Sequence, residues 1–382
     1  MKVTIDAHKA LLSKARGAAN YTTHLIRALL KRNSFEYELA FFDKNRELGH
    51  RQIIKDIFNI KDNALAECNE IKYADLNKGV TFKTFAELCK TTGDILHFPI
   101  DLHAPCFPGG KSIITAHDLG GIMNYPGVSE YYTPKEAYGW SSKLNMVLRP
   151  DTRAIIANSE FTKQCFQEYF PYLSDRIYVA HLGFDSEQYK KEINNGVFKK
   201  YSIGEQYFFY LGILCTRKNI FRILDAFEII AEKYKDVQFV FSGDMRIHMR
   251  HEEWIMRLLT SKVRDRIIVT GRITDDEARN LYSGATGFVF PSLHEGFGIP
   301  ILEAQACGCP VITSNNTACP EVAGKSALLI NPHDTEEISD AMEQLLNNSN
   351  LRTSLATDGY ENIKRFSWDK CAEETEKVYE IF

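Results

Sequence analysis

The chain has 382 residues, of which 44% are hydrophobic and 25% are charged, and its formal net charge at pH 7 is −4. This length favours two domains, and the hydrophobic fraction is sufficient to build a core in each of them. The slightly acidic charge balance argues against nucleic-acid binding, which requires a strongly basic surface.

The first half of the chain alternates short apolar segments with amphipathic ones. Residues 3–5 predict a strand, and the small residues of 14–20, which include Gly17 and Ala18, predict a loop. A helix should follow the loop, because five apolar residues fall on one helical face: Tyr21, Leu25, Ile26, Leu29 and Leu30. Further strands are expected at 37–42, 94–98, 112–116, 153–157 and 176–180, with helices at 134–148 and 159–170. This alternation is typical of a doubly wound α/β domain, whereas residues 47–88 show no clear pattern.

The second half repeats the same alternation after a polar stretch, 186–204, that we interpret as a linker. Strands are expected at 207–211, 237–241, 266–269, 287–290, 311–313 and 327–330, and helices include 220–234 and 275–283. We therefore predict an N-terminal domain over 1–185 and a C-terminal domain over 186–366, with a cleft between them. The final residues, 367–382, predict an amphipathic helix with Ser367 as its N-cap, and we expect this helix to pack on the first domain.

Residues 286–314 carry the clearest signs of a ligand site. Phe288–Phe290 predicts a buried strand, Pro300 suits the first turn of a helix, and Gly308 ends that helix. Glu295 then lies in the strand-to-helix loop and Glu303 lies one turn into the helix, at the edge of a parallel sheet where ligands bind. The positive end of the helix can accept phosphate on the backbone N–H groups of Gly296, Phe297, Gly298 and Ile299. Two acids beside a phosphate seat point to a sugar nucleotide, whose neutral hydroxyls they can bind.

Two further sets of candidates stand at strand ends. Arg217 and Lys218 follow strand 207–211 and can neutralise a diphosphate, although an isolated Arg-Lys pair is often an ordinary surface feature. His117 follows strand 112–116 and is joined by Asp118, so it is a stronger catalytic candidate than His97, although a histidine at a strand end is often structural. The chain contains no Asp-x-Asp, the usual ligand pair for a metal on a nucleotide sugar, so we expect no metal site.

The spacing Glu295-x7-Glu303 lies within His-Glu-Gly-Phe-Gly-Ile-Pro-Ile-Leu-Glu-Ala and has supporting matches along most of the chain, including Ala157-Asn-Ser-Glu-Phe161 and His181-Leu-Gly-Phe-Asp185. In these motifs the sequence resembles the retaining glycosyltransferases of family 4, which have the GT-B fold: two Rossmann-like, doubly wound α/β domains that face a central cleft. The resemblance is strongest over 207–332 and nearly absent over 44–90.

This resemblance implies roles for the candidate residues. Glu303 would hold the ribose hydroxyls, while Glu295 and the amides of 296–299 would hold the donor sugar and its phosphates. Arg217 and Lys218 would stabilise the leaving diphosphate, His117 would face the sugar at the reacting centre, and the segment with Gly17 and Ala18 would approach the phosphates. Two positions depart from the family pattern: Ile213 stands where many members have arginine, and Ala18 and Ala19 stand where glycine is common.

The implied activity is the transfer of a hexosyl unit from a nucleoside diphosphate sugar, with retention at the anomeric carbon and without cofactor or metal. The segment from Gly212 to Asn219 resembles that of mannosyltransferase-like members, which favours mannose and hence GDP-mannose as the donor. A glycan or lipid-linked oligosaccharide acceptor in surface polysaccharide synthesis is expected. The alternatives are a non-catalytic sugar-nucleotide-binding protein of the same fold, and a GT-B epimerase or phosphorylase.

The sequence also indicates a compartment. No signal-peptide pattern follows Met1, no apolar run approaches the ~20 residues that span a bilayer, and the nine cysteines form no Cys-x-x-Cys pair. We therefore expect a cytoplasmic protein, in contact at most with the inner face of the membrane. Lys31 and Arg32, and the basic residues around Trp140, are the candidates for peripheral contact with anionic lipid.

Overall fold

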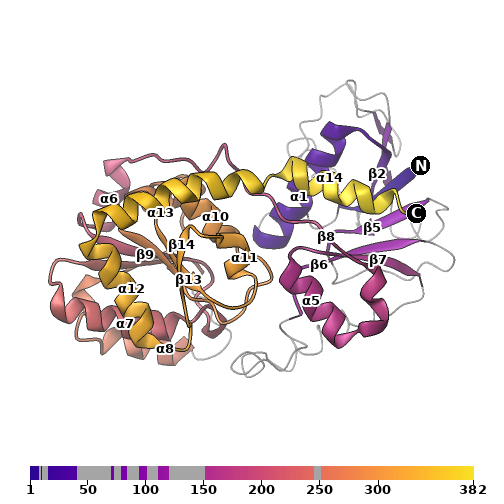
Figure 1. Ribbon diagram of the computed structural model, residues 1–382. Coiled ribbons are helices and arrows are strands. Elements are labelled where there is room, and N and C mark those ends of the chain that lie inside the picture. The colour runs from indigo at the N-terminus through magenta and orange to yellow at the C-terminus, as the bar shows by residue number, and fades with distance from the viewer. Residues whose placement is uncertain are drawn as a thin grey trace. The chain divides into compact units, whose positions relative to one another are not determined.

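The computed structural model contains two compact α/β units (Figure 1). It describes residues 1–7, 10, 16–40, 70–72, 79–83, 94–100, 111–119, 151–244 and 251–382. The first unit contains strands β1–β8 with helices α1, α5 and α14, and the second contains β9–β14 with helices α6–α13. The chain passes from the first unit to the second between Gly183 and Phe184, and it returns after Ser367.

An eight-stranded sheet forms the centre of the first unit, in the order β3-β4-β2-β1-β5-β6-β7-β8. Its pairings are parallel except that of β3 with β4, which is antiparallel. The strands are β1 (Lys2–Asp6), β2 (Glu36–Ala40), β3 (Glu70–Lys72), β4 (Gly79–Lys83), β5 (Ile95–Phe98), β6 (Ser112–Ala116), β7 (Thr152–Ala157) and β8 (Ile177–Val179). Every residue of β5 and β6 is buried, as expected for parallel strands covered on both faces. The predicted strands are confirmed within their described parts; β3 and β4 were not predicted.

The described helices of the first unit are α1 (Arg16–Arg32), α5 (Glu160–Tyr169), α14 (Trp368–Tyr379) and the 3-10 helix η4 (Pro171–Arg176). The apolar face predicted for the first helix is buried, but the prediction of a loop through 20 is wrong, because α1 already begins at Arg16. Alanine is the best helix former, and a glycine in the first turn costs little, so the small residues extend the helix. Ser159 caps α5 by accepting a hydrogen bond from the Thr162 N–H. The helix predicted at 134–148 lies outside the described residues.

The C-terminal helix α14 lies alongside α1 in the first unit (Figure 1). The carboxylate of Glu376, buried in this contact, accepts hydrogen bonds from Arg32 Nε at 2.6 Å, Ser34 Oγ at 3.0 Å and Tyr37 Oη at 2.7 Å. Lys31 pairs with Asp369 on the same helix. Both cations considered for lipid contact on α1 are therefore compensated by carboxylates of α14.

The second unit has a six-stranded sheet in the order β11-β10-β9-β12-β13-β14, with parallel pairing throughout. Its strands are β9 (Tyr207–Leu211), β10 (Gln238–Ser242), β11 (Ile267–Gly271), β12 (Gly287–Phe290), β13 (Val311–Ser314) and β14 (Ala327–Ile330). All residues of β9, β12 and β13 are buried, so these three strands form the core of the sheet. The six strands predicted for this half are confirmed to within two residues at their ends.

Helices surround this sheet and complete the α/β pattern. They are α6 (Asn195–Tyr201), α7 (Ile220–Lys233), α8 (His251–Leu259), α9 (Asp275–Gly284), α10 (Ile299–Ala306), α11 (Cys319–Ala323), α12 (Thr335–Asn347) and α13 (Ser349–Asn362), with 3-10 turns at η5 (Thr216–Lys218), η6 (Arg264–Arg266) and η7 (Ile363–Arg365). No described helix combines the length and the apolar character needed to cross a bilayer.

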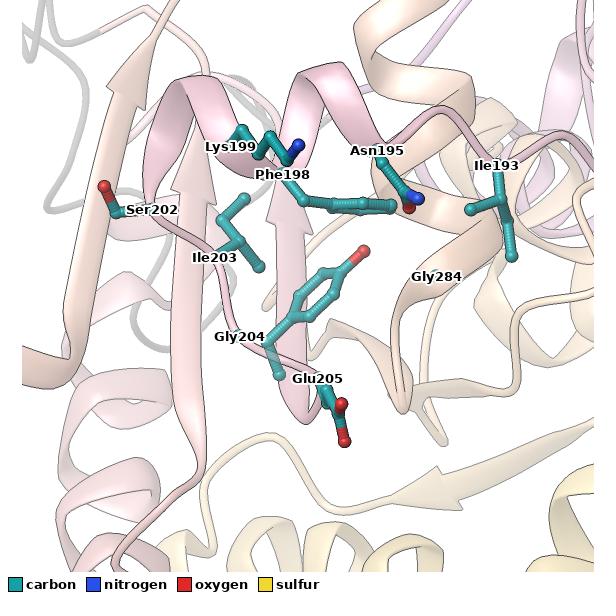
Figure 2. Close-up of a pocket in the computed structure, with 10 residues that line it drawn as sticks. Ile193, Asn195, Phe198, Lys199, Ser202, Ile203, Gly204, Glu205 and Gly284 are labelled. Carbon is teal, nitrogen blue, oxygen red and sulfur yellow. The ribbon is translucent and has the colours of Figure 1, made fainter.

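The interpretation of 186–204 as a linker is wrong over its second part, because 195–201 forms α6. Asn194 caps this helix, and both Lys200 and Tyr201 bond the carboxylate of Glu277 on α9. Figure 2 shows a pocket between α6 and the start of β9, into which the ring of Phe198 projects. This pocket lies at the amino end of β9, whereas ligands of parallel α/β sheets bind at the carboxyl ends.

Candidate active site

The carboxyl ends of β9 and β12 lie at the same edge of the sheet, because the two strands are neighbours and parallel. The loop after β9 contains Arg217 and Lys218, and the loop after β12 contains Glu295. Backbone contacts join the loops: the Leu293 N–H donates to the Arg217 carbonyl at 2.9 Å, and the Arg217 guanidinium donates to the His294 carbonyl at 2.6 Å. The structure thus brings the adjacent Arg217 and Lys218 together with Glu295, which lies 77 residues after Lys218.

A compact group of three charges results. Lys218 Nζ donates to Glu295 Oε1, and Arg217 Nη1 lies 3.6 Å from the same oxygen. Burial by itself would raise the pKa of Glu295, but the two cations lower it to about 2, so the carboxylate stays ionised. Lys218 also lies over the ring of Phe290, with its Nζ 4.7 Å from the ring centre. The cations expected to face a diphosphate are therefore paired with Glu295.

Asn219 fixes the loop that carries these cations. Its backbone is left-handed, with φ 63°, where η5 ends and α7 begins. Its side-chain amide donates to the carbonyls of Pro291 at 3.0 Å and Pro332 at 2.6 Å. A single side chain therefore joins the loops that follow β9, β12 and β14.

The strand edge here is also held by two glycines. Gly243 follows β10 with φ +137°, and a Cβ atom at this position would lie 1.7 Å from the Gly212 carbonyl oxygen. A side chain at 243 would push the loop after β9 away from its neighbour. The close approach of the two backbones explains why glycine occurs there.

Helix α10 presents its N-terminus to the same edge. Gly298 is its N-cap residue, with φ 115°, and provides no side-chain acceptor for the N–H groups of the first turn, while Pro300 occupies that turn. Such an end is suited to an anion, as expected for the segment Gly296–Ile299. Glu303, one turn into α10, is half-buried and accepts a hydrogen bond from Tyr282 Oη at 3.2 Å.

The remaining candidates belong to the first unit. His117 is half-buried after β6, and its Nε2 lies 3.0 Å from the Pro99 carbonyl oxygen. A carbonyl only accepts, so Nε2 carries the proton of this hydrogen bond. Gly17 is exposed in the first turn of α1, where a Cβ atom would meet nothing within 4 Å, and Ala18 follows it in the helix. Neither therefore lies in a loop, and at Gly17 no close contact requires glycine.

Two positioning residues were not assigned a role from the sequence. Asn219 directly follows the Arg-Lys pair and ends η5, and asparagine adopts the left-handed conformation more readily than most residues other than glycine. Tyr282 lies on α9, and the sequence around it indicated no contact with Glu303. Its bond to Glu303 depends on the packing of α9 against α10.

Comparison with known proteins shows which family the chain resembles. The model of the family described as glycosyl transferases group 1 matches residues 197–362. The O-antigen chain mannosyltransferase B of Escherichia coli is 30% identical over 276 residues, which covers 71% of this chain and 70% of that relative. The serotype-specific mannosyltransferase WbdA of Escherichia coli is 32% identical over 275 residues, which covers 69% of this chain but only 32% of the longer relative.

Solved structures show the same fold at low sequence identity. Anabaena HepE in complex with UDP-glucose matches with a TM-score of 0.74 and 15% identity over 100% of both chains. The sucrose-phosphate synthase of Thermosynechococcus elongatus matches with a TM-score of 0.72 and 15% identity over 100% of this chain and 98% of that one. The fold class predicted from the sequence is confirmed, and so is the resemblance to glycosyltransferases. This chain belongs to the group 1 glycosyl transferases and has the GT-B fold.

Proposed function

We propose that this glycosyltransferase moves a mannosyl unit from GDP-mannose to a glycan or lipid-linked oligosaccharide acceptor in the synthesis of a surface polysaccharide. The observation that carries the proposal is the group of Arg217, Lys218 and Glu295 at the joined carboxyl ends of β9 and β12. Two cations beside an uncapped helix N-terminus suit a diphosphate. The preference for mannose is supported by the two Escherichia coli relatives, both of which are mannosyltransferases.

The second unit would bind the donor. Arg217, Lys218 and the amides of 296–299 would hold the diphosphate, and Glu303, oriented by Tyr282, would accept hydrogen bonds from the ribose hydroxyls. Glu295 would accept from hydroxyls of the hexose, because its pKa of about 2 keeps it ionised. The first unit would bind the acceptor and would present His117 to the donor sugar.

Retention at the anomeric carbon is best served by departure of the diphosphate on the face from which the acceptor hydroxyl arrives. The bond from the anomeric carbon to the phosphate oxygen breaks, the bond to the acceptor oxygen forms, and the acceptor proton passes to the leaving phosphate. Fixed cations and N–H groups stabilise the charge that develops on the diphosphate. A protein-bound cation pair can thus take the place of a divalent metal, so we propose a metal-independent reaction.

Peripheral membrane contact is not included in this proposal. Lys31 and Arg32 would have to leave Asp369 and Glu376 to meet anionic lipid. An acceptor that carries a lipid would itself bring the protein to the membrane.

A donor screen tests the proposal directly. The melting temperature of the protein is measured with GDP, UDP and ADP and with their hexose conjugates, because a tight ligand stabilises the folded state by mass action. We expect the largest rise with GDP-mannose, and a mannosylated acceptor whose anomeric configuration, read by NMR, matches that of the donor. A larger rise with another nucleotide would contradict the donor assignment, and an inverted product would contradict the mechanism.

A further inference from the structure

A buried chain of polar side chains runs through the first unit. His97 of β5 is fully buried; its Nδ1 lies 2.5 Å from Tyr379 Oη and its Nε2 lies 2.9 Å from Thr115 Oγ1. The Thr115 hydroxyl also lies 3.0 Å from Tyr21 Oη. Four residues of four elements are thus connected, from α14 through β5 and β6 to α1, and none is more than 1% exposed.

The direction of the hydrogen bonds follows from the chemistry of the groups. Burial, and to a smaller extent nearby His117, lower the pKa of His97 to about 3, so the ring is neutral with one donor and one acceptor. Within the described part of the chain, His97 is the one acceptor within reach of the Tyr379 hydroxyl. A buried hydroxyl proton requires an acceptor, so Tyr379 donates to Nδ1, and Nε2–H must donate to Thr115.

This hydrogen-bond chain ends beside two groups that contact the His117 ring. The ring of Tyr21, whose hydroxyl bonds Thr115, meets the ring of His117 edge-on, with centroids 4.7 Å apart and planes at 84°. The Pro99 carbonyl, two residues after His97, accepts the Nε2 proton of His117. The orientation of the His117 ring therefore depends on Tyr21 and on the end of β5, and both are connected to Tyr379.

We propose that Tyr379, His97, Thr115 and Tyr21 are positioning residues that fix the ring orientation and tautomer of His117, and that docking of the C-terminal helix α14 is thereby required for transfer. The catalytic consequence rests on the proposed function, in which His117 faces the donor sugar. The structural consequence is a change in the environment of the His117 ring when this hydrogen-bond chain is interrupted. It does not depend on the proposed function. The two consequences can be measured separately.

The test compares Tyr379, which lies on α14, with Tyr37, whose hydroxyl donates a hydrogen bond to α14. Tyr379→Phe removes the hydroxyl at the start of the hydrogen-bond chain. The control, Tyr37→Phe, removes a buried hydroxyl that binds Glu376 of α14 but has no connection to His117. Both variants should lower the melting temperature. Only Tyr379→Phe should lower kcat, by about tenfold with an unchanged donor KM, because a small misplacement of a reacting group is costly.

Tyr21→Phe interrupts the hydrogen-bond chain at a second point, and it keeps the ring that contacts His117. We expect it to reduce kcat in the same manner as Tyr379→Phe. The ring nitrogens of His117, identified in the ¹⁵N spectrum through their loss in His117→Gln, should shift in both variants but not in Tyr37→Phe. This readout uses the 382-residue protein without added ligand and requires no turnover.

The outcomes separate the two ideas. If the His117 signals do not shift in Tyr379→Phe or Tyr21→Phe, or shift equally in Tyr37→Phe, the positioning chain is refuted whatever the activity. If they shift as expected but His117→Gln retains full kcat, the role of His117 in the proposed function fails and the chain stands as a structural support. A fall in kcat that matches that of Tyr37→Phe would also overturn the proposal.

Discussion

Replacing Lys218 with methionine removes the cation that contacts Glu295 and keeps a side chain of similar length. Burial would raise the pKa of Glu295, but Lys218 and Arg217 lower it from the ordinary 4.5 to about 2. Since one pKa unit corresponds to about 1.4 kcal/mol, the ionised carboxylate contributes roughly 3 kcal/mol to the stability of the second unit. Because the folded-state pKa is lowered, this contribution is complete above pH 4.5 and is lost as the pH falls toward 2.

In Lys218→Met, Arg217 remains 3.6 Å from Glu295 but no longer outweighs the cost of burying the carboxylate. We therefore expect the variant to lose about 4–5 kcal/mol at pH 7, the usual cost of breaking a buried ion pair. Adding Glu295→Gln removes the stranded charge and should restore at least half of the loss. Burial then dominates the pKa of Glu295 in the single variant and raises it, so its deficit should shrink between pH 7 and pH 5.

The assay must report the second unit alone, because one free energy of unfolding is not defined for a protein with two units. Native-state hydrogen exchange of the β12 amides at increasing urea concentration meets this need. Equal losses in Lys218→Met and in the double variant would refute the reasoning, since no coupling between the two side chains would then exist. A deficit independent of pH would refute the assignment of the effect to the charge of Glu295.

Three further predictions concern the same unit. Glu303→Ala should weaken donor binding, because ribose contacts are similar in the ground and transition states, whereas Glu295→Ala should lower the single-turnover rate; equal binding losses with unchanged rates would contradict this division. Turnover should persist in excess EDTA, and its loss there with recovery on adding Mn²⁺ would show that a metal serves the diphosphate. Asn219→Ala should lower the stability of the second unit by about 2 kcal/mol, because it removes two hydrogen bonds and places alanine in a left-handed backbone. Asn219→Gly should lose less, because glycine tolerates that backbone; equal losses in the hydrogen-exchange assay would exclude a backbone contribution.

The strands of both units were predictable because parallel strands are buried on both faces. Tyr207–Leu211 and Gly287–Phe290 read as continuous apolar runs, and the structure places them at the centre of a sheet. Helix α6 was missed for the opposite reason. Its seven residues have no buried member, and its visible support comes from Asn194 and from Glu277 of a helix about 80 residues away. A segment that depends on tertiary contacts carries little local signal.

The candidate site likewise combines features that the sequence predicts with others that depend on tertiary contacts. The rule that loops meet at the carboxyl ends of parallel strands was enough to predict that Arg217, Lys218 and Glu295 share an edge. It did not predict that the cations pair with the carboxylate, because side-chain partners depend on rotamers and on the backbone contacts between the loops. The bridging bonds of Asn219 were equally hidden, since they join three loops that are far apart in the chain.

The pairing within this site reconciles stability with the binding of an anion. Two neighbouring cations that are largely removed from water would repel one another and destabilise an empty site, and Glu295 offsets that repulsion. A nucleoside diphosphate sugar brings about two negative charges, so Arg217 and Lys218 can exchange the carboxylate for phosphate oxygens and remain paired throughout. Under the proposed function, Glu295 is then released toward sugar hydroxyls, which are neutral donors, and its low pKa ensures that it receives their hydrogen bonds as a carboxylate.

The exchange also makes donor binding sensitive to Glu295 in two opposite directions. Loss of its charge frees the cations for phosphate, and loss of its oxygens removes a contact to the sugar. Affinity for a free nucleoside diphosphate should therefore rise in Glu295→Gln even where the affinity for the sugar nucleotide falls.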